Sequence, residues 1–294
     1  MWPSSLAALL WLLLSGGSAL AAVALDCPDT VDEGAPFLVR LRSDAALQSV
    51  RVEWLGKTLR PEPRRTEKGW EAVALLGMGL RERLKGDRHA LQVRVESAQG
   101  AETHRKTVAR RAVAYPEQHL TVSGKYASLS TADLARHARE RKLVVRALAT
   151  LTEPARWQLP FLRPVPGEAS SPFGLRRFFN KQPRQPHNGL DLRGPEGTPV
   201  LAVAPGAVVL ADDHFFSGKS VFLDHGEGVV SMYFHLSEID VQSGDTVAAG
   251  DAIGAIGSTG RVTGPHLHLG TYILGQPVDP TRLLDPAFPN ENTP

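Results

Sequence analysis

Histidine and aspartate residues at metal-ligand spacing occur in the second half of this sequence of 294 residues. His266 and His268 are separated by one residue, so on a β-strand both side chains point to the same face. Such a pair can bind a metal together, or one imidazole can bind it while the other transfers protons. His187 and Asp191 lie four residues apart, where Gly189 indicates a loop that enters a strand. Two imidazole nitrogens and one carboxylate oxygen, with a water as the fourth ligand, make an open zinc site of the catalytic type.

The cysteine content argues against a closed structural zinc site, because the chain contains a single cysteine, Cys27. Taken alone, a His-x-His pair is more typical of exposed strand positions. The accompanying His187 and Asp191 favour a hydrolytic metal centre instead.

Several further short motifs surround these residues. In chain order the set is Ser171-Pro172-Phe173-Gly174-x-Arg176, His187-x-x-x-Asp191, Gly197-Thr198-Pro199-Val200, Gly260-x-x-x-Gly264-Pro265-His266-Leu267-His268 and Val278-Asp279-Pro280. Each motif is weakly specific alone, but their order and spacing over roughly 110 residues are specific. Together they resemble peptidase family M23, the LytM or lysostaphin-like metallopeptidases of peptidoglycan.

The resemblance implies that zinc (Zn²⁺) is held by His187, Asp191 and His268. It implies that His235 and His266 are catalytic histidines that do not bind the metal. One of them would move a proton from the attacking water to the leaving amine, and the other would stabilise the oxyanion. The sequence leaves open which histidine has which role. All five positions carry the residues that the family requires, whereas relatives that have lost zinc ligands act as activators of other wall enzymes.

By this resemblance the chain is a secreted zinc metalloendopeptidase that hydrolyses peptide cross-links or stem peptides of peptidoglycan in cell-wall remodelling. The bond is left open between a D-alanine cross-link and a glycine bridge. An alternative from a different class is a non-hydrolytic, zinc-binding regulator of another cell-wall hydrolase, with cell-envelope proteins as partners.

Strand and turn patterns predict a mainly β chain with two domains. Residues 170–285 carry continuous apolar runs and frequent glycine, and the resemblance implies the compact antiparallel β fold of a LytM-type peptidase domain. Residues 23–115 carry short alternating strands separated by turns, typical of a β-sandwich such as the immunoglobulin fold. Residues 116–169 predict a helical and proline-rich linker, with Ser130 as the N-cap of a helix that continues towards Leu148.

The first residues predict export. Residues 1–21 contain a short apolar run followed by small residues, which is typical of a secretory signal peptide. The run is too short for a spanning helix. We therefore expect secretion across the inner membrane to the periplasm or cell envelope, without stable membrane insertion; an uncleaved anchor is the alternative, because this segment lacks Lys and Arg. The net charge of +2 gives no support for nucleic-acid binding.

Outside the motifs, we expect His89 and His104 at the surface, and His214 and His225 at the surface or in loops. For Arg176, a contact to substrate or ligands and a purely structural role are equally open.

Overall fold

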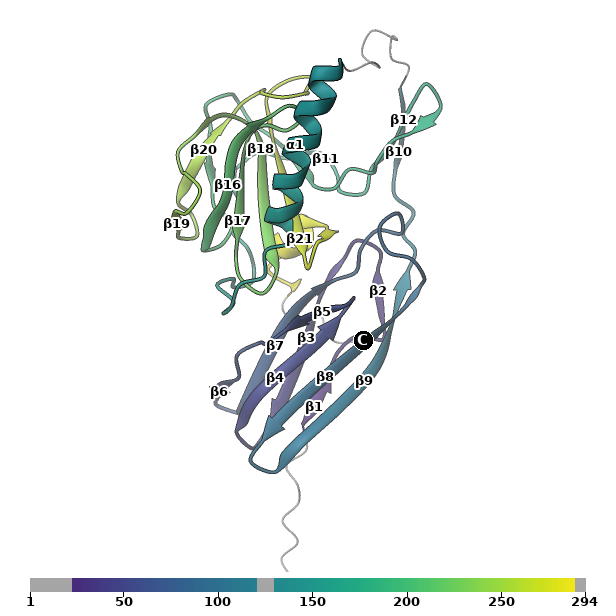
Figure 1. Ribbon diagram of the computed structural model, residues 1–294, viewed down its shortest axis with the longest axis vertical. Coiled ribbons are helices and arrows are strands. Elements are labelled where there is room, and N and C mark those ends of the chain that lie inside the picture. Colours follow the sequence, from purple (N-terminus) through teal and green to yellow (C-terminus); the bar gives the residue numbers. More distant parts are fainter. Residues whose placement is uncertain (1–22, 121–129, 289–294) are drawn as a thin grey trace, which may run out of the picture.

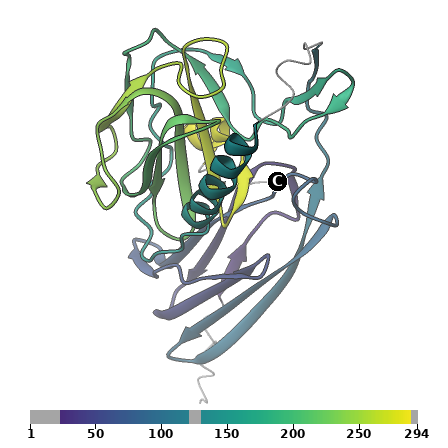
Figure 2. The same cartoon turned by 45° about the horizontal axis from the view of Figure 1, so that its top comes forward.

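The computed structural model describes residues 23–120 and 130–288, and the predicted leader at 1–21 lies outside these ranges. The described chain is mainly β, as predicted. Two sheets form its N-terminal half, one large sheet forms its C-terminal half, and a helix and a small sheet come between them in the chain (Figure 1). Both views place the helix against the C-terminal sheet (Figure 1; Figure 2).

The N-terminal half consists of two sheets with the strand order of an immunoglobulin-type sandwich. The first sheet has the order β1 (Ala24–Asp26), β3 (Pro36–Ser43), β7 (Gly69–Gly77) and β6 (Arg64–Thr66). The second has the order β2 (Thr30–Asp32), β9 (Gly100–Arg111), β8 (Arg88–Ser97), β4 (Leu47–Trp54) and β5 (Lys57–Leu59). Neighbours pair antiparallel except β2 and β9, which are parallel.

Alternate side chains of these two sheets pack against each other. Trp54, at the end of β4, is 1% exposed, and its indole N–H donates to Gly77 O of β7 at 3.0 Å. Its ring lies 5.3 Å from the ring of Phe37 on β3, in an edge-to-face arrangement. A buried aromatic side chain with a satisfied N–H therefore holds the two sheets face to face.

The C-terminal half is built on a sheet of 10 strands that brings distant parts of the sequence together. Its main order is β11 (Ala169–Ser171), β14 (Leu190–Arg193), β21 (His266–Ile273), β18 (Val229–Ile239), β17 (Gly218–Asp224), β16 (Gly206–His214) and β19 (Thr246–Val247). The shorter strands β15 (Pro199–Leu201), β20 (Ala252–Ile256) and β22 (Gln276–Val278) pair at its sides, and α2 (Pro280–Leu284) follows. Because β14, β21 and β18 are neighbours, the segments that carry the predicted site lie side by side.

The helix α1 (Thr131–Leu148) begins at the predicted N-cap, Ser130. The Ser130 hydroxyl accepts from Asp133 N, and the Asp133 carboxylate accepts from Ser130 N, which completes a capping box. Ala147 of the helix is buried against Met232 of β18. The helix therefore covers part of one face of the C-terminal sheet. None of the described helices is long and apolar enough to cross a membrane.

The proline-rich segment at 149–168 is packed against the C-terminal half. Arg156 N donates to His225 O and Phe161 N donates to Leu283 O, both at 2.7 Å. The Phe161 side chain is buried. The sequence predicted an extended linker here, and tertiary contacts hold that extended chain on the surface of the sheet.

Arg176 lies at the contact between the two halves. It belongs to β12 (Arg176–Phe179), which pairs with β10 (Glu117–Leu120) and β13 (Gln182–Pro183) in the small sheet. Its Nη1 lies 2.9 Å from Glu82 Oε1, and its Nη2 lies 3.8 Å from Glu33 Oε1, both carboxylates of the N-terminal half. Of the two roles left open for Arg176, these ion pairs support the structural one.

Candidate metal centre

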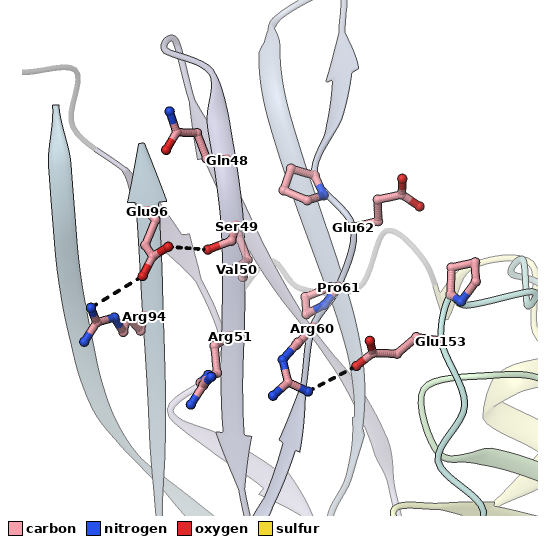
Figure 3. A pocket seen from close by; sticks show the side chains of 12 residues that line it. Gln48, Ser49, Val50, Arg51, Arg60, Pro61, Glu62, Arg94, Glu96 and Glu153 are labelled. Atoms are coloured by element: carbon pink, nitrogen blue, oxygen red, sulfur yellow. Dashed lines mark hydrogen bonds and ion pairs between the residues drawn. The ribbon is translucent and has the colours of Figure 1, made fainter. Parts of the chain in front are cut away.

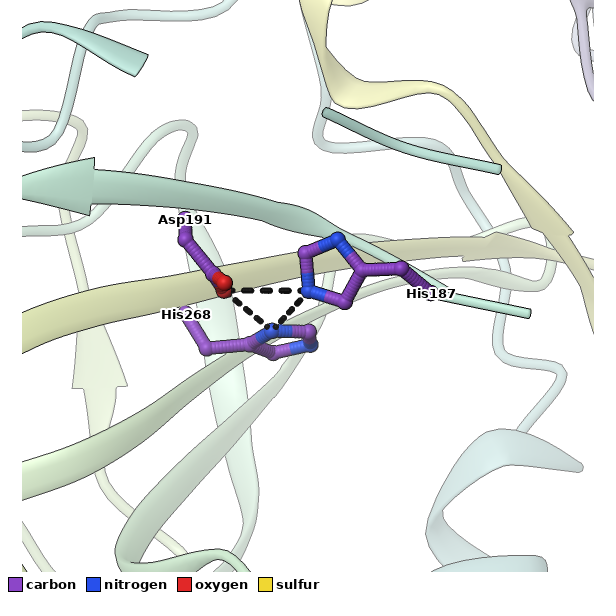
Figure 4. Close-up of side chains that lie close together, drawn as sticks. All are labelled: His187, Asp191 and His268. Carbon is purple, nitrogen blue, oxygen red and sulfur yellow. Dashed lines mark hydrogen bonds and ion pairs between the residues drawn. The ribbon is translucent and has the colours of Figure 1, made fainter. Parts of the chain in front are cut away.

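The three predicted metal ligands converge on one point (Figure 4). His187 Nε2 lies 3.0 Å from Asp191 Oδ1 and 3.0 Å from His268 Nδ1. His268 Nδ1 lies 2.9 Å from Asp191 Oδ1. Within residues 23–120 and 130–288, no other three His, Cys, Asp or Glu side chains converge in this way.

Strand pairing and one glycine position these ligands. In the antiparallel register of β14 and β21, Asp191 is directly opposite His268, so their side chains lie next to each other on one face. His187 lies in the loop before β14, where its N–H donates to Leu175 O at 3.0 Å. A Cβ atom at Gly189 would lie 2.6 Å from His268 Nε2, so glycine is required for the His268 ring to occupy this place.

The protonation states suit metal binding. His187 Nδ1 donates to Pro172 O at 2.8 Å, because a carbonyl oxygen can only accept, and this directs Nε2 at the other ligands. Burial alone would raise the pKa of the Asp191 carboxyl, but hydrogen bonds with His187 and His268 lower that pKa well below its usual range. Burial lowers the pKa of His268, which favours its neutral form.

His235 and His266 lie beside the triad and share one tautomer. His266 Nδ1 donates to Gly264 O and His235 Nδ1 donates to Thr259 O, both at 2.9 Å. In each neutral ring, Nε2 is therefore a free acceptor. His266 Nε2 lies 3.8 Å from Asp191 Oδ1, and the His235 and His266 ring centroids are 5.0 Å apart.

His235 reaches this face through a left-handed backbone conformation. Simple alternation along β18 would point His235 away from the face that carries Phe234 and His268. Its φ of 66° interrupts that alternation, the pairing of β18 with β17 is irregular between Tyr233 and Leu236, and its N–H donates to Ser217 O at 2.9 Å. Such a conformation is uncommon for a residue other than glycine, and it is often found at functional sites.

Phe234 connects the triad to the apolar surface beneath α1. Its ring stacks on His268, with centroids 5.2 Å apart and planes at 11°. The same side chain packs against the buried cluster that contains Ala147, Met232 and Tyr272. The orientation of His268 therefore depends on the packing that also docks the helix.

The donor set fits zinc. Tetrahedral zinc with bonds of about 2.0–2.1 Å separates its ligand atoms by about 3.3 Å. The three observed separations, between 2.9 and 3.0 Å, differ from this by a few tenths of an ångström. Two imidazoles and one carboxylate, with His187 held by Pro172 O, have the composition of the three-ligand sets found in catalytic zinc sites.

The expectation for the histidines outside the motifs is wrong for His89 and His214. His89 (β8) and His214 (β16) are buried strand residues, whereas His225 lies in a loop, as expected, and is fully buried there. His225 Nδ1 donates to Pro205 O at 2.7 Å, and its Nε2 accepts from Ser231 Oγ at 2.7 Å. Burial lowers the pKa of His225 to about 4. His225 and Ser231 belong to a hydrogen-bonded chain that continues through Tyr233 Oη, 3.0 Å from Ser231 Oγ.

A hollow of about 840 Å³ lies away from this site, between the N-terminal half and the proline-rich segment at Glu153 (Figure 3). Arg60 reaches across it to Glu153 at 3.5 Å, and Arg94 pairs with Glu96 at 3.4 Å. The residues that line it include no histidine or cysteine. It is therefore a charged surface hollow without the residue types of the metal centre.

Comparison with known proteins places the site in a recognised sequence family. A model of peptidase family M23 matches residues 185–280, the segment that contains the triad and both further histidines. Over 111 residues the chain is 44% identical to peptidoglycan DD-endopeptidase ShyA of Vibrio cholerae serotype O1, covering 37% of this chain and 26% of that protein. Over 118 residues it is 42% identical to DD-carboxypeptidase/endopeptidase Mpg of Neisseria meningitidis serogroup B, covering 40% and 27%. The chain thus spans about a quarter of the length of these two relatives.

A solved structure is similar over most of the chain. It is a protein of Pseudomonas aeruginosa assigned to peptidase M23, with a TM-score of 0.63 and 32% identity. The match covers 86% of this chain and 94% of that one, so it extends well beyond the C-terminal sheet into the N-terminal half.

Proposed function

This chain belongs to peptidase family M23, and on that basis we propose that it is a secreted zinc endopeptidase that hydrolyses peptide bonds of peptidoglycan. The observation that carries the proposal is the convergence of His187, Asp191 and His268 at 2.9–3.0 Å. The free Nε2 atoms of two further histidines beside this triad support a hydrolytic role rather than a structural metal site.

His187, Asp191 and His268 are the proposed metal ligands. A zinc ion bound there would supply Lewis-acid polarisation of the scissile carbonyl and would lower the pKa of a water molecule towards neutrality. The chain contributes the orientation of the ligands, because Pro172 O fixes the His187 tautomer and strand register fixes Asp191 against His268.

We assign proton transfer to His266 and His235. His266 is the proposed base that takes the proton of the attacking water, because its free Nε2 lies 3.8 Å from a ligand atom, Asp191 Oδ1. His235 is the proposed second proton carrier. Burial, with a smaller contribution from His268, lowers the pKa of His235 to about 4, so its resting form is neutral. After accepting at Nε2 the proton that His266 took from the water, His235 can pass that proton to the leaving amine, or donate it in a hydrogen bond to the developing oxyanion.

The substrate and the location are also proposals. The name of one relative, a peptidoglycan DD-endopeptidase, points to peptide bonds in peptidoglycan, and we propose D-alanine cross-links as the first candidates. Peptidoglycan lies outside the inner membrane, which agrees with the leader expected at 1–21 and with a periplasmic or cell-envelope location. We propose residues 170–285 as the peptidase domain and residues 23–115 as a separate β domain that positions it.

The alternative, a non-hydrolytic zinc-binding regulator, is less well supported because no catalytic position is altered. A regulator needs only the three metal ligands. This chain also carries His235 and His266 beside them, and both rings hold Nδ1 against a backbone carbonyl, which leaves Nε2 available.

The test is hydrolysis of cross-linked muropeptides by the full chain loaded with zinc, read by mass spectrometry. We expect dimers to become monomers and a chelator to stop the reaction. His187→Ala should lose both zinc and activity, and His266→Ala should keep zinc and lose activity. The matched control is His119→Gln, an exposed histidine of the small sheet, which should behave as the unaltered protein. A zinc-loaded chain that cleaves nothing, or a fully active His266→Ala variant, would contradict the proposal.

A further inference from the structure

The charges around the histidines differ from those of the domain that contains them. From residue 160 onward the chain carries 9 Lys and Arg against 14 Asp and Glu, so this region is net acidic. Yet the residues that flank the histidine pair in the structure include two exposed arginines, Arg193 and Arg261. A basic rim in an acidic domain indicates a local requirement for positive charge.

Arg193 lies on the face that carries the metal ligands. It follows Asp191 by two residues on β14, so the two side chains share a face. In the pairing of β14 with β21, Arg193 is directly opposite His266, just as Asp191 is directly opposite His268. Directly opposite side chains on antiparallel strands have Cβ atoms about 4.5–5.5 Å apart. The Arg193 side chain therefore begins beside the proposed base.

The Arg193 guanidinium is available for a ligand. Its backbone N–H donates to Glu168 O at 2.9 Å, which fixes the end of the strand. Its exposed side chain makes no hydrogen bond or ion pair with any residue of 23–120 or 130–288. An arginine with five unused donors next to reacting groups is suited to bind a carboxylate through two parallel hydrogen bonds.

Arg261 adds positive charge on the loop that holds His235. It lies two residues after Thr259, whose carbonyl accepts from His235 Nδ1 at 2.9 Å. Its guanidinium lies over the Phe216 ring, 4.5 Å from the centroid, and it forms no ion pair within the described chain. Burial, followed by the nearby charge of Arg184, lowers the pKa of Arg261. Arg261 is thus held in place by an aromatic contact, whereas Arg193 has no partner that occupies its donors.

We propose that Arg193 is a specificity-determining residue that binds a carboxylate of the peptide substrate beside the scissile bond. This inference rests on the proposed peptidase function and narrows its substrate class to peptides with a free carboxylate next to the bond that is cleaved. Arg193 forms paired N–H···O hydrogen bonds to this group while His266 faces the attacking water. Arg261 adds positive charge near His235 without contacting the carboxylate.

The experiment compares two synthetic cross-linked peptides that differ only in whether this carboxylate is free or amidated. For the zinc-loaded full chain, we expect kcat/KM to be about 10- to 100-fold higher on the free carboxylate, because charge-assisted hydrogen bonds contribute on this scale. Arg193→Ala should lose this preference while cleaving the amidated peptide at the unaltered rate. Arg193→Lys should restore part of it, since lysine keeps the charge but not the paired geometry.

The matched control is Arg51→Ala, which removes an exposed strand arginine with no hydrogen bond or ion pair in the described chain, on the N-terminal half. It should leave both rates unchanged. Equal cleavage of the two peptides by the unaltered chain would overturn the role of Arg193 and leave the peptidase proposal standing. An equal loss on both peptides in Arg193→Ala would also overturn it, since that pattern reports displacement of His266. Cleavage of neither peptide would overturn the peptidase proposal itself, together with this inference.

Discussion

One face of the C-terminal sheet is divided into a covered half and an open half. In the covered half, Met232 and Tyr272 are buried beneath Ala147 of α1. In the half that we call open, Asp191 and His268 lie next to each other and converge with His187. The same two strands, β18 and β21, run through both halves. The division is therefore made by side-chain type along a strand rather than by a change of fold.

This difference shows how a packed helix can support a site that it does not contribute to. Along β21, the side chains of His266, His268 and Tyr272 point to the same face of the sheet. The apolar ring of Tyr272 is stabilised by burial under α1, whereas the two imidazoles must stay accessible to a metal or substrate. Phe234 lies at the boundary, because it stacks on His268 and packs with the cluster under α1. Packing in the covered half thus holds Phe234 in place, and Phe234 in turn orients His268 in the open half.

Asp191→Asn is the change with the largest expected effect, and it is confined to the open half. An amide cannot supply the ionised oxygen that the triad needs, so we expect loss of bound zinc and at least a ~1000-fold lower rate, with the fold retained. Zinc content and muropeptide hydrolysis measure the two effects. Glu196→Gln makes the same chemical change at an exposed acid outside the triad and should alter neither. Retention of both zinc and activity in Asp191→Asn would remove this residue from the site.

Ala147→Asp breaks the covered half instead. A carboxylate placed between α1 and the sheet is buried without a partner, and we expect the free energy of unfolding to fall by about 3–5 kcal/mol. Ala138→Asp makes the same substitution at an exposed position of the same helix, so it carries the helix-propensity cost alone. Urea unfolding of the two variants gives the difference. Equal losses would show that α1 is not held by this contact.

The sequence predicted the open half better than its surroundings. Alternation placed His266 and His268 on one face, and the family resemblance added Asp191 and His187 at one site; the structure brings all four together. The start of α1 was also predictable, since the Ser130 capping box is a local signal. The roles of these site residues stay proposals.

Other features depend on tertiary structure and left no local signal. The left-handed conformation of His235 is imposed by the irregular pairing of β18, and nothing in its neighbours specifies it. His225 lies in a polar, glycine-flanked segment that is typical of a surface loop, yet the surrounding strands bury it completely. Arg176 finds its partners Glu82 and Glu33 in the other half of the molecule, a contact between residues far apart in sequence.

We expect His225 to make the free energy of unfolding depend on pH. Its pKa is about 4 in the folded protein and 6.5 ordinarily, so the unfolded chain binds an extra proton between these values. Stability is therefore complete above pH 6.5 and is lost as the pH falls towards 4. The expected loss is about 2 kcal/mol between about pH 7.5 and about pH 5, by the linkage of one group.

The measurement is urea unfolding across this pH range for the unaltered protein and His225→Gln. The difference between the two is the informative quantity, because burial raises the pKa of Glu227 to about 7 and its stability contribution falls as the pH rises. His225→Gln should remove the histidine component of the slope. Parallel pH profiles would show that His225 does not titrate differently on unfolding.

Phe234→Ala tests the boundary between the two halves and has the smallest expected effect. Removing the ring frees one side of His268, and we expect zinc affinity to fall about 10-fold, the lower end for loss of a group that orients a metal ligand. Phe234→Leu keeps most of the packing volume without the stacked ring and should give an intermediate loss. Val144→Ala, which trims the α1 side of the same cluster, should lower stability and leave zinc affinity unchanged. If Val144→Ala weakens zinc as much as Phe234→Ala, then His268 depends on the whole covered half. If neither variant lowers the zinc affinity, the His268 imidazole is oriented by Asp191 and not by Phe234.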